Sequence, residues 1–169
     1  MDLATAILTA LMALPCPRDE PAEVCKPWRA EVSTAIAQAT KGNEKLAAQL
    51  AEIGYHESAF RKRIQAGDCH DGKRYGAPGE CDQVWDANGV HRHLARSEWQ
   101  IHSGGLVARA DWRAMKGTDP VSLLLSAKIA LRIYQHDPAA FGRGAPTGKR
   151  AQLANRILTD IRKAQASNP

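Results

Sequence analysis

Apolar residues recur every three or four positions along most of this chain, a period typical of amphipathic α-helices. The first such stretch, residues 3–14, follows Asp2, whose side chain can cap a helix N-terminus. We expect a packed first helix rather than a secretory signal, since no lysine or arginine precedes the apolar run. The same period predicts further helices over residues 28–40, from Asn43 to the region of Glu57, over 106–115, from Asp119-Pro120 and from about Lys149. Asn43 and Asp119 are the expected N-caps of their helices.

Two stretches lack this period. Residues 15–27 contain four prolines, which predict that the first helix stops and a loop follows. Residues 61–94 are rich in glycine and polar side chains, and they predict a loop that can include a short hairpin. The predicted fold class is therefore mainly α. The expected organisation is one helical domain over residues 1–169, with N-terminal helices in 1–42 and a core in 43–166 that carries a cysteine-containing loop or hairpin insertion at 61–96.

The helix predicted from Asn43 places a carboxylate on its apolar face. Leu46, Leu50 and Ile53 follow one another at i, i+4 and i+7. Glu57 falls at i+11 on the same stripe. Burial there and the negative end of the helix dipole would both raise the pKa of the Glu57 carboxyl group. An acid that stays protonated near neutral pH is what general-acid cleavage of a glycosidic bond requires, whereas a solvated Glu57 on a frayed last turn would be inert.

The residues around Glu57 resemble those of a known family. The pattern Leu-Ala-x-x-Leu-Ala-x-Ile-x-x-x-Glu-Ser-x-Phe, which ends at Phe60, is similar to the catalytic helix of the lysozyme-like soluble lytic transglycosylases. In that family the glutamate of the Glu-Ser pair is the acid and base, and an apolar-Gln-apolar motif follows it. Trp99-Gln100-Ile101 resembles this second motif. The resemblance extends over roughly residues 46–161, although its matching motifs are short.

The resemblance implies a lysozyme-like fold and cleavage of the MurNAc–GlcNAc β-1,4 bond of peptidoglycan by a single glutamate, with no cofactor and no metal. It implies Glu57 as the catalytic residue, and Ser58, Gln100, Trp99 and Tyr134 as substrate-binding residues. The expected partners are peptidoglycan glycan strands, with no nucleic acid and no stable membrane insertion. The expected location is periplasmic, extracellular or virion-associated, where the protein could belong to a larger secretion or phage assembly.

The chain departs from the family pattern in two respects. Glu57 and Gln100 are 43 positions apart, which is further than in familiar members. The family also carries a tyrosine near its end, where this chain has Phe141, although Tyr134 could supply a hydroxyl instead. Two alternatives therefore stand beside a transglycosylase. One is a hydrolytic muramidase that uses Glu98 or Asp111 as a second carboxylate, and the other is a weakly active structural module of the same fold.

Composition and charge change this picture little. Hydrophobic residues make up 44% and charged residues 24% of the chain, which is a globular composition. The net charge of +5 and the pI of about 9.2 suit an anionic polymer such as cell wall or a nucleic acid. The basic residues are dispersed along the chain, which argues against a nucleic-acid track. Four tryptophans could be core anchors or sugar platforms, and core is the commoner use: Trp28, Trp85, Trp99 and Trp112.

The four cysteines fall into two local pairs, Cys16 with Cys25 and Cys69 with Cys81. Each pair brackets loop sequence, so we favour these two disulfides among the three possible connectivities. They would imply an oxidising environment. A zinc site in the second loop is less favoured, because its spacings do not match common zinc motifs. The candidate ligands there are Cys69, His70, Cys81, His91 and His93.

Overall fold

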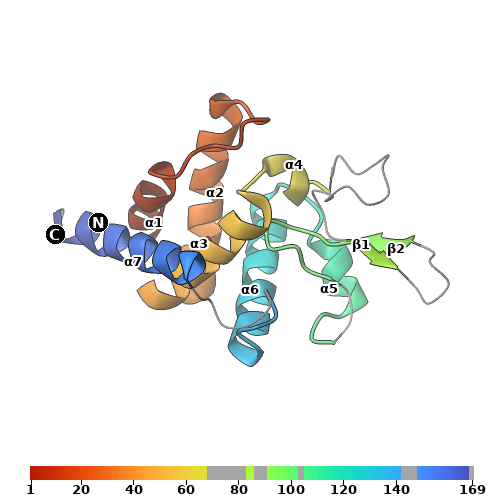
Figure 1. Cartoon of the computed structure of the whole chain (residues 1–169). Helices are drawn as coiled ribbons and strands as arrows, with labels where there is room; N and C mark the ends of the chain where they lie inside the picture. Colours follow the sequence, from red (N-terminus) through yellow and green to blue (C-terminus); the bar gives the residue numbers. More distant parts are fainter. Residues whose placement is uncertain (68–82, 86–90, 103–104, 142–147, 168–169) are drawn as a thin grey trace.

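The structure is a computed structural model of the chain, and it describes residues 1–67, 83–85, 91–102, 105–141 and 148–167. Over these residues the protein is mainly helical, with one two-stranded hairpin (Figure 1). The helices are α1 (Leu3–Met12), α2 (Ala22–Thr40), α3 (Glu44–Ser58), α4 (Lys62–Gln65), α5 (Arg109–Ala114), α6 (Pro120–His136) and α7 (Lys149–Ser167). The mainly α class predicted from the sequence is confirmed.

The first helix packs into the core, as predicted. Asp2 is its N-cap, and the Asp2 carboxylate accepts a hydrogen bond from Thr5 N at 3.0 Å. Ile7 and Leu11 lie on its buried face and are 0% exposed. No helix within the described residues is both long enough and apolar enough to cross a membrane.

The second helix begins six residues earlier than the sequence predicted. It starts at Ala22, and Pro27 lies inside it rather than in a loop. Pro27 is the sixth residue of the helix, so it removes the backbone donor that would otherwise bond to the carbonyl group of Glu23. Cys25 and Trp28 are both buried on the core side of this segment. We attribute the earlier start to the burial of these two side chains.

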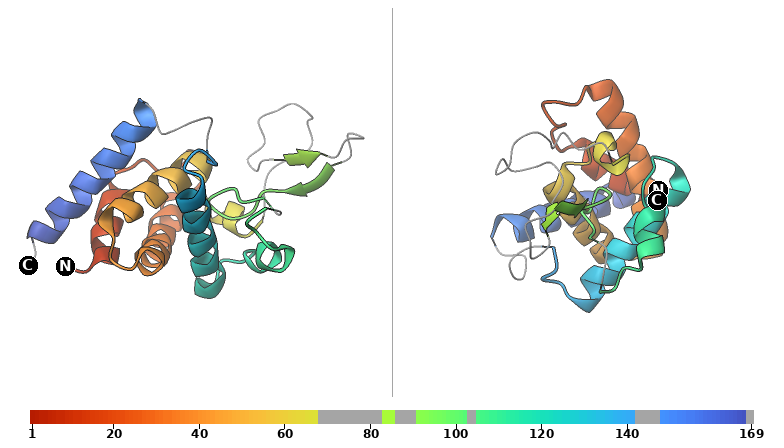
Figure 2. Two further views of the ribbon diagram at one scale, coloured as in Figure 1. Left: turned by 90° about the horizontal axis from the view of Figure 1, so that it is seen from below. Right: turned by 90° about the vertical axis from the view of Figure 1, so that its right-hand side faces the viewer.

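Helix α3 lies at the centre of the helical part, where it contacts α1, α2, α6 and α7. Asn43 caps it and accepts from Leu46 N at 3.1 Å, as predicted. Helix α7 lies along α1 and α3, and α6 packs against α2 (Figure 1). The two chain termini lie side by side at one end of the molecule, while the hairpin lies at the other (Figure 2).

The segment predicted as a loop that can include a short hairpin does contain a hairpin, and it also contains a short helix that was not predicted. Helix α4 follows α3 almost at once, and strands β1 (Gln83–Trp85) and β2 (His91–Leu94) pair antiparallel. Cys69, His70 and Cys81 lie outside the described residues, so the second predicted disulfide stays a prediction. Within the described part of the chain, no cluster of three or more His, Cys, Asp or Glu side chains could hold a metal ion.

The core consists of apolar side chains from α1, α2, α3 and α6, completed by α7. The three tryptophans whose side chains the structure describes belong to it, as expected of core anchors: Trp28 is 2%, Trp99 0% and Trp112 9% exposed. Trp99 Nε1 donates to Leu50 O of α3 at 2.9 Å, so even its polar atom is satisfied inside the core.

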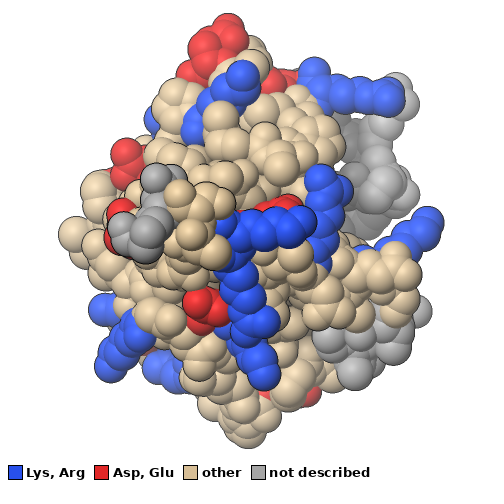
Figure 3. Space-filling view, turned by 90° about the vertical axis from the view of Figure 1, so that its left-hand side faces the viewer, with Lys and Arg blue, Asp and Glu red and all other residues tan. Residues whose placement is uncertain are grey.

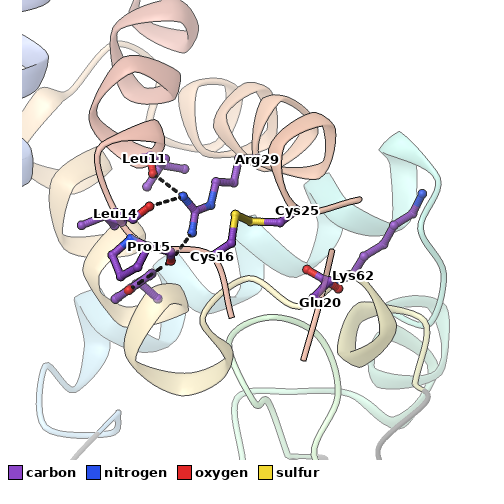
Figure 4. Close-up of a disulfide and its surroundings, with 9 residues drawn as sticks. Leu11, Leu14, Pro15, Cys16, Glu20, Cys25, Arg29 and Lys62 are labelled. Atoms are coloured by element: carbon purple, nitrogen blue, oxygen red, sulfur yellow. Dashed lines mark hydrogen bonds between the residues drawn. A yellow bond between two sulfur atoms is a disulfide. The ribbon is translucent and has the colours of Figure 1, made fainter. Parts of the chain in front are cut away.

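Cys16 and Cys25 form a disulfide, as predicted, between the end of α1 and the first turns of α2 (Figure 4). Next to it the buried guanidinium group of Arg29 donates to the carbonyl oxygens of Leu11, Leu14 and Pro15, each at 2.7 Å. Leu11 O also accepts from Leu14 N at 3.1 Å, whereas Leu14 and Pro15 lie beyond the end of α1, so Arg29 ties the end of the helix to the residues that follow it. The disulfide and Arg29 together fix the loop between α1 and α2.

That loop is also bound to the segment that follows α3. The Glu20 carboxylate accepts from Lys62 N at 2.9 Å. Asp19 forms ion pairs with Arg61 at 3.1 Å and with Arg63 at 2.6 Å. The residues directly after the C-terminus of α3 are therefore held from the N-terminal side of the fold.

Candidate functional site

A cavity of about 630 Å³ lies beside the C-terminal end of α3, and Glu57 lines it. Its walls come from the end of α3, residues 100–102 and 106–107, the end of α6 with the residues after it, and the beginning of α7. Ile101, Val107 and Phe141 are among its apolar lining residues. The polar lining residues are His56, Glu57, Gln100, His102, His136, Asp137 and Arg150. Apolar walls with a few convergent polar groups are typical of ligand sites.

Glu57 reaches the cavity because α3 stops directly after it. Leu50 and Ile53, on the same stripe, are 1% and 2% exposed and belong to the core. The Glu57 side chain is 18% exposed. The stripe therefore runs from the core to the edge of the cavity, so that Glu57 is neither fully buried nor on an open surface. Ala59 and Phe60 then adopt positive φ angles of 53° and 56°, which end the helix.

Two cationic or potentially cationic groups lie beside the Glu57 carboxylate. His56 Nδ1 is 3.5 Å and Arg150 Nη1 is 4.0 Å from Glu57 Oε1. A neighbouring cation stabilises the ionised form of a carboxylate. The sequence interpretation of Glu57 considered only burial and the helix dipole. It did not include Arg150, which comes from a helix almost a hundred residues later.

Arg150 is fixed in place by a second glutamate of α3. Its Nε atom is 2.7 Å from Glu52 Oε1, and the Glu52 side chain is 1% exposed. Arg150 also donates a hydrogen bond to Phe141 O. This buried ion pair joins the start of α7 to α3 and places the guanidinium group next to Glu57. Sequence reasoning missed both members of the ion pair, Glu52 and Arg150, because nothing in the local pattern distinguishes Glu52 from a surface glutamate.

Gln100 lines the same cavity as Glu57, although 43 positions separate them in sequence. A tight turn presents it: Arg96 and Ile101 are paired by two backbone hydrogen bonds of 2.9 and 2.8 Å, and Gln100 within the turn has a φ of 50°. The structure thus brings together the two residues that carry the sequence resemblance.

Two predicted substrate-binding residues do not line this cavity, which corrects the sequence interpretation. Ser58 is 2% exposed, and its hydroxyl group contacts the carboxyl group of Glu98 at 2.5 Å. Trp99 is 0% exposed and belongs to the core, so it cannot form a wall of the groove. Both residues neighbour a cavity residue in sequence, but their side chains point the other way because they fill the interior behind α3.

Tyr134 lies in a different place from the one proposed for it. It lines a second, much smaller cavity together with Glu52, Phe141 and Arg150, and it is not among the residues that line the Glu57 cavity. Phe141 lines both cavities. The position that resembles the family tyrosine therefore does lie at the candidate site, and in this chain it presents a phenyl ring.

The second carboxylate of the Glu57 cavity is Asp137. The sequence suggested Glu98 or Asp111 for that role, and neither of them lines the cavity. Glu98 is 0% exposed, and its burial raises the pKa of its carboxyl group to about 8. Asp137 directly follows α6, and its carboxylate accepts from Ala139 N at 2.9 Å. In the sequence, the only feature that pointed to Asp137 as a site residue was its position just after a predicted helix.

The face of the protein in Figure 3 carries mixed rather than uniformly basic charge. On the face in Figure 3, lysine and arginine side chains lie beside acidic ones. On α7, Arg162 pairs with Glu44 at 3.0 Å and Arg156 pairs with Asp160 at 3.8 Å. Exposed pairs of this kind contribute little to stability.

Comparison of the chain with protein-family models, with curated proteins and with solved structures found no match.

Proposed function

We propose that this protein is a peptidoglycan lytic transglycosylase with a lysozyme-like arrangement of helices, and that Glu57 is its catalytic acid and base. The supporting observation is that Glu57 and Gln100 line one cavity. These are the two positions at which the sequence resembles the catalytic and glutamine motifs of that family. They are 43 positions apart in the sequence.

The cavity suits a sugar of the glycan strand. Its volume of about 630 Å³ is in the range of small-ligand sites. Gln100 offers both an amide donor and a carbonyl acceptor, which match hydroxyl and N-acetyl groups. Ile101, Val107 and Phe141 offer apolar contacts for the carbon face of a sugar ring.

In the proposed reaction, Glu57 starts in its protonated form, although Arg150 and His56 favour its carboxylate. It first donates its proton to the glycosidic oxygen as the C1–O bond of MurNAc breaks. The C6 hydroxyl group of the same MurNAc then attacks C1 and gives its proton to the Glu57 carboxylate. The product is a 1,6-anhydro ring, and the glutamate is again protonated. Because the attacking hydroxyl belongs to the same sugar, no second residue has to activate water. Arg150 stabilises the carboxylate form of Glu57 between the two steps.

The test is the substitution Glu57→Gln, which keeps the shape of the side chain and removes its acid. Clearing of purified cell wall should fall by about 10²–10⁴-fold, the contribution typical of a general acid–base group. The matched control is Glu44→Gln at the opposite end of the same helix, which should clear cell wall like the wild type. A Glu57→Gln protein as active as this control would overturn the assignment.

Phe141 favours one second candidate, a structural module of the same fold that binds glycan strands without cleaving them. In that case the wild-type protein would sediment with insoluble peptidoglycan but would release no soluble fragments. Substitution of Gln100 by Ala should weaken sedimentation in either case, since both functions use the same cavity.

A further inference from the structure

The turn that follows Glu57 is conformationally unfavourable and must be held by its surroundings. Ala59 and Phe60 are consecutive non-glycine residues with positive φ angles. Residues with a Cβ atom persist in this conformation only where neighbouring groups fix them. Here the Ser58 hydroxyl group accepts a hydrogen bond from Phe60 N at 3.0 Å, across the turn.

Ser58 is in turn held by Glu98, a carboxyl group that lies completely inside the protein. Ser58 Oγ and Glu98 Oε2 are 2.5 Å apart, and Trp28 Nε1 donates to Glu98 Oε1 at 2.5 Å. Glu98 N donates to Gln65 Oε1 at 3.3 Å. The Glu98 side chain thus joins α2 to the last residue of α3, and its backbone joins α4 to the same cluster.

We propose that Glu98 is a positioning residue, which fixes through Ser58 the turn at the end of α3 and thereby holds Glu57 in the cavity. This inference rests on the proposed function for its effect on activity. It assigns Glu98 no contact with the substrate, because Glu98 does not line the cavity.

The hydrogen bonds indicate that Glu98 performs this role as an uncharged acid. Gly54 O, 3.0 Å from Ser58 Oγ, can only accept a hydrogen bond, whereas Phe60 N can only donate one. The single hydroxyl proton of Ser58 can therefore go to Gly54 O only if the Glu98 carboxyl group supplies the proton of its own bond to Ser58. Trp28 Nε1 meanwhile donates to the other carboxyl oxygen. Protonated Glu98 is the form that satisfies all of these contacts at once.

The electrostatic surroundings agree with this assignment. Complete burial raises the pKa of Glu98 to about 8, and the hydrogen bond from Trp28 offsets only part of this rise. Among the charged groups that act on it, Glu20 raises and Arg61 lowers the pKa. The contacts from α2 and α4 come from Trp28 and Gln65, which carry no charge.

The experiment compares turnover of purified cell wall by wild type, Glu98→Gln, Glu98→Ala and Ser58→Ala between pH 5 and 9, with the exposed Glu31→Gln as a control. Glutamine can donate to Ser58 and accept from Trp28, so Glu98→Gln should turn over like wild type at pH 6. At pH 9, about one unit above the pKa of Glu98, it should exceed wild type by about tenfold. Glu98→Ala and Ser58→Ala should lose about 10²-fold at pH 6, because Glu57 is no longer held in place.

A constant ratio of Glu98→Gln to wild-type turnover across this pH range would overturn the proposal, and so would a Glu98→Gln protein as impaired as Glu98→Ala at pH 6.

A second measurement separates this inference from the proposed function. Amide hydrogen exchange of residues 55–61 should be faster in Glu98→Ala and Ser58→Ala than in wild type, and should be restored in Glu98→Gln. If the wild type cleaves no cell wall, the proposed function fails, but the exchange rates still decide whether Glu98 holds the turn. Unchanged exchange in Glu98→Ala would refute it.

Discussion

The buried carboxyl group of Glu98 predicts a specific dependence of folding stability on pH. In the unfolded chain this group should titrate near its ordinary pKa of 4.5, whereas burial raises the pKa in the folded protein to about 8. Below about pH 4.5 both states carry the proton. Between the two values only the folded state retains it, so unfolding releases a proton and stability falls as pH rises. Above about pH 8 both states are ionised, and the contribution has been lost.

The expected size of this loss is large for a single group. At about 1.4 kcal/mol per pH unit, the interval between the two pKa values corresponds to roughly 5 kcal/mol. That is comparable to the entire free energy of unfolding of many small domains. Other groups also titrate over this range, so the quantity to compare is the difference between the wild type and Glu98→Gln, in which this titration is absent.

Urea unfolding followed by tryptophan fluorescence at several pH values between 5 and 9 measures this difference. The wild type should lose stability relative to Glu98→Gln progressively over the interval, and most of the loss should be complete near pH 8. The slopes of free energy against urea should stay equal, so that the comparison remains a two-state one. The free energies of unfolding of the two proteins can be plotted against pH. If the two curves run parallel and differ by less than about 0.5 kcal/mol at every pH, Glu98 is not a buried neutral acid in solution.

Two further substitutions test the framework of the site. Arg150→Met removes the cation from the buried Glu52 carboxylate and should destabilise the protein by about 3–5 kcal/mol in urea unfolding. The control Arg156→Met, on the exposed face of α7, should cost no more than about 1 kcal/mol. Equal effects of the two substitutions would show that the ion pair of Arg150 with Glu52 is solvated. Gly54→Ala would place a methyl group against the Phe60 ring, and this overpacking should cost about 1–3 kcal/mol in the same assay. An unchanged unfolding midpoint would contradict the close approach of Phe60 to α3.

The helical pattern allowed most elements of the fold to be predicted. Asn43 and Asp119 were recognised as N-caps because their side chains act locally on the turn that follows. The start of α2 was misplaced because prolines were taken to end all helical structure. Pro27 is instead tolerated near the N-terminus of a helix that buries Cys25 and Trp28. Helix α4 has only four residues, too few to show a period.

The site was predictable only where its residues belong to a motif. Glu57 and Gln100 were proposed from short patterns and do line one cavity. Ser58 and Trp99 belong to the same patterns but point into the interior, and a motif read in one dimension does not give the direction of a side chain. Arg150 and Asp137 enter the cavity through tertiary packing of α6 and α7. Such long-range contacts leave no trace in a local sequence pattern.

The measurement that most directly tests the assignment of Glu57 is mass spectrometry of the fragments released from purified peptidoglycan. With Glu57 as the only acid and base, and with the C6 hydroxyl group as nucleophile, the released muropeptides should end in 1,6-anhydro-N-acetylmuramic acid. Each should be lighter by one water than a hydrolysed fragment, and Glu57→Gln should release almost none of them. Reducing ends throughout the wild-type digest would contradict the transglycosylase mechanism. They would instead identify a hydrolase whose water is activated by a second carboxylate, for which Asp137 is the group that lines the cavity.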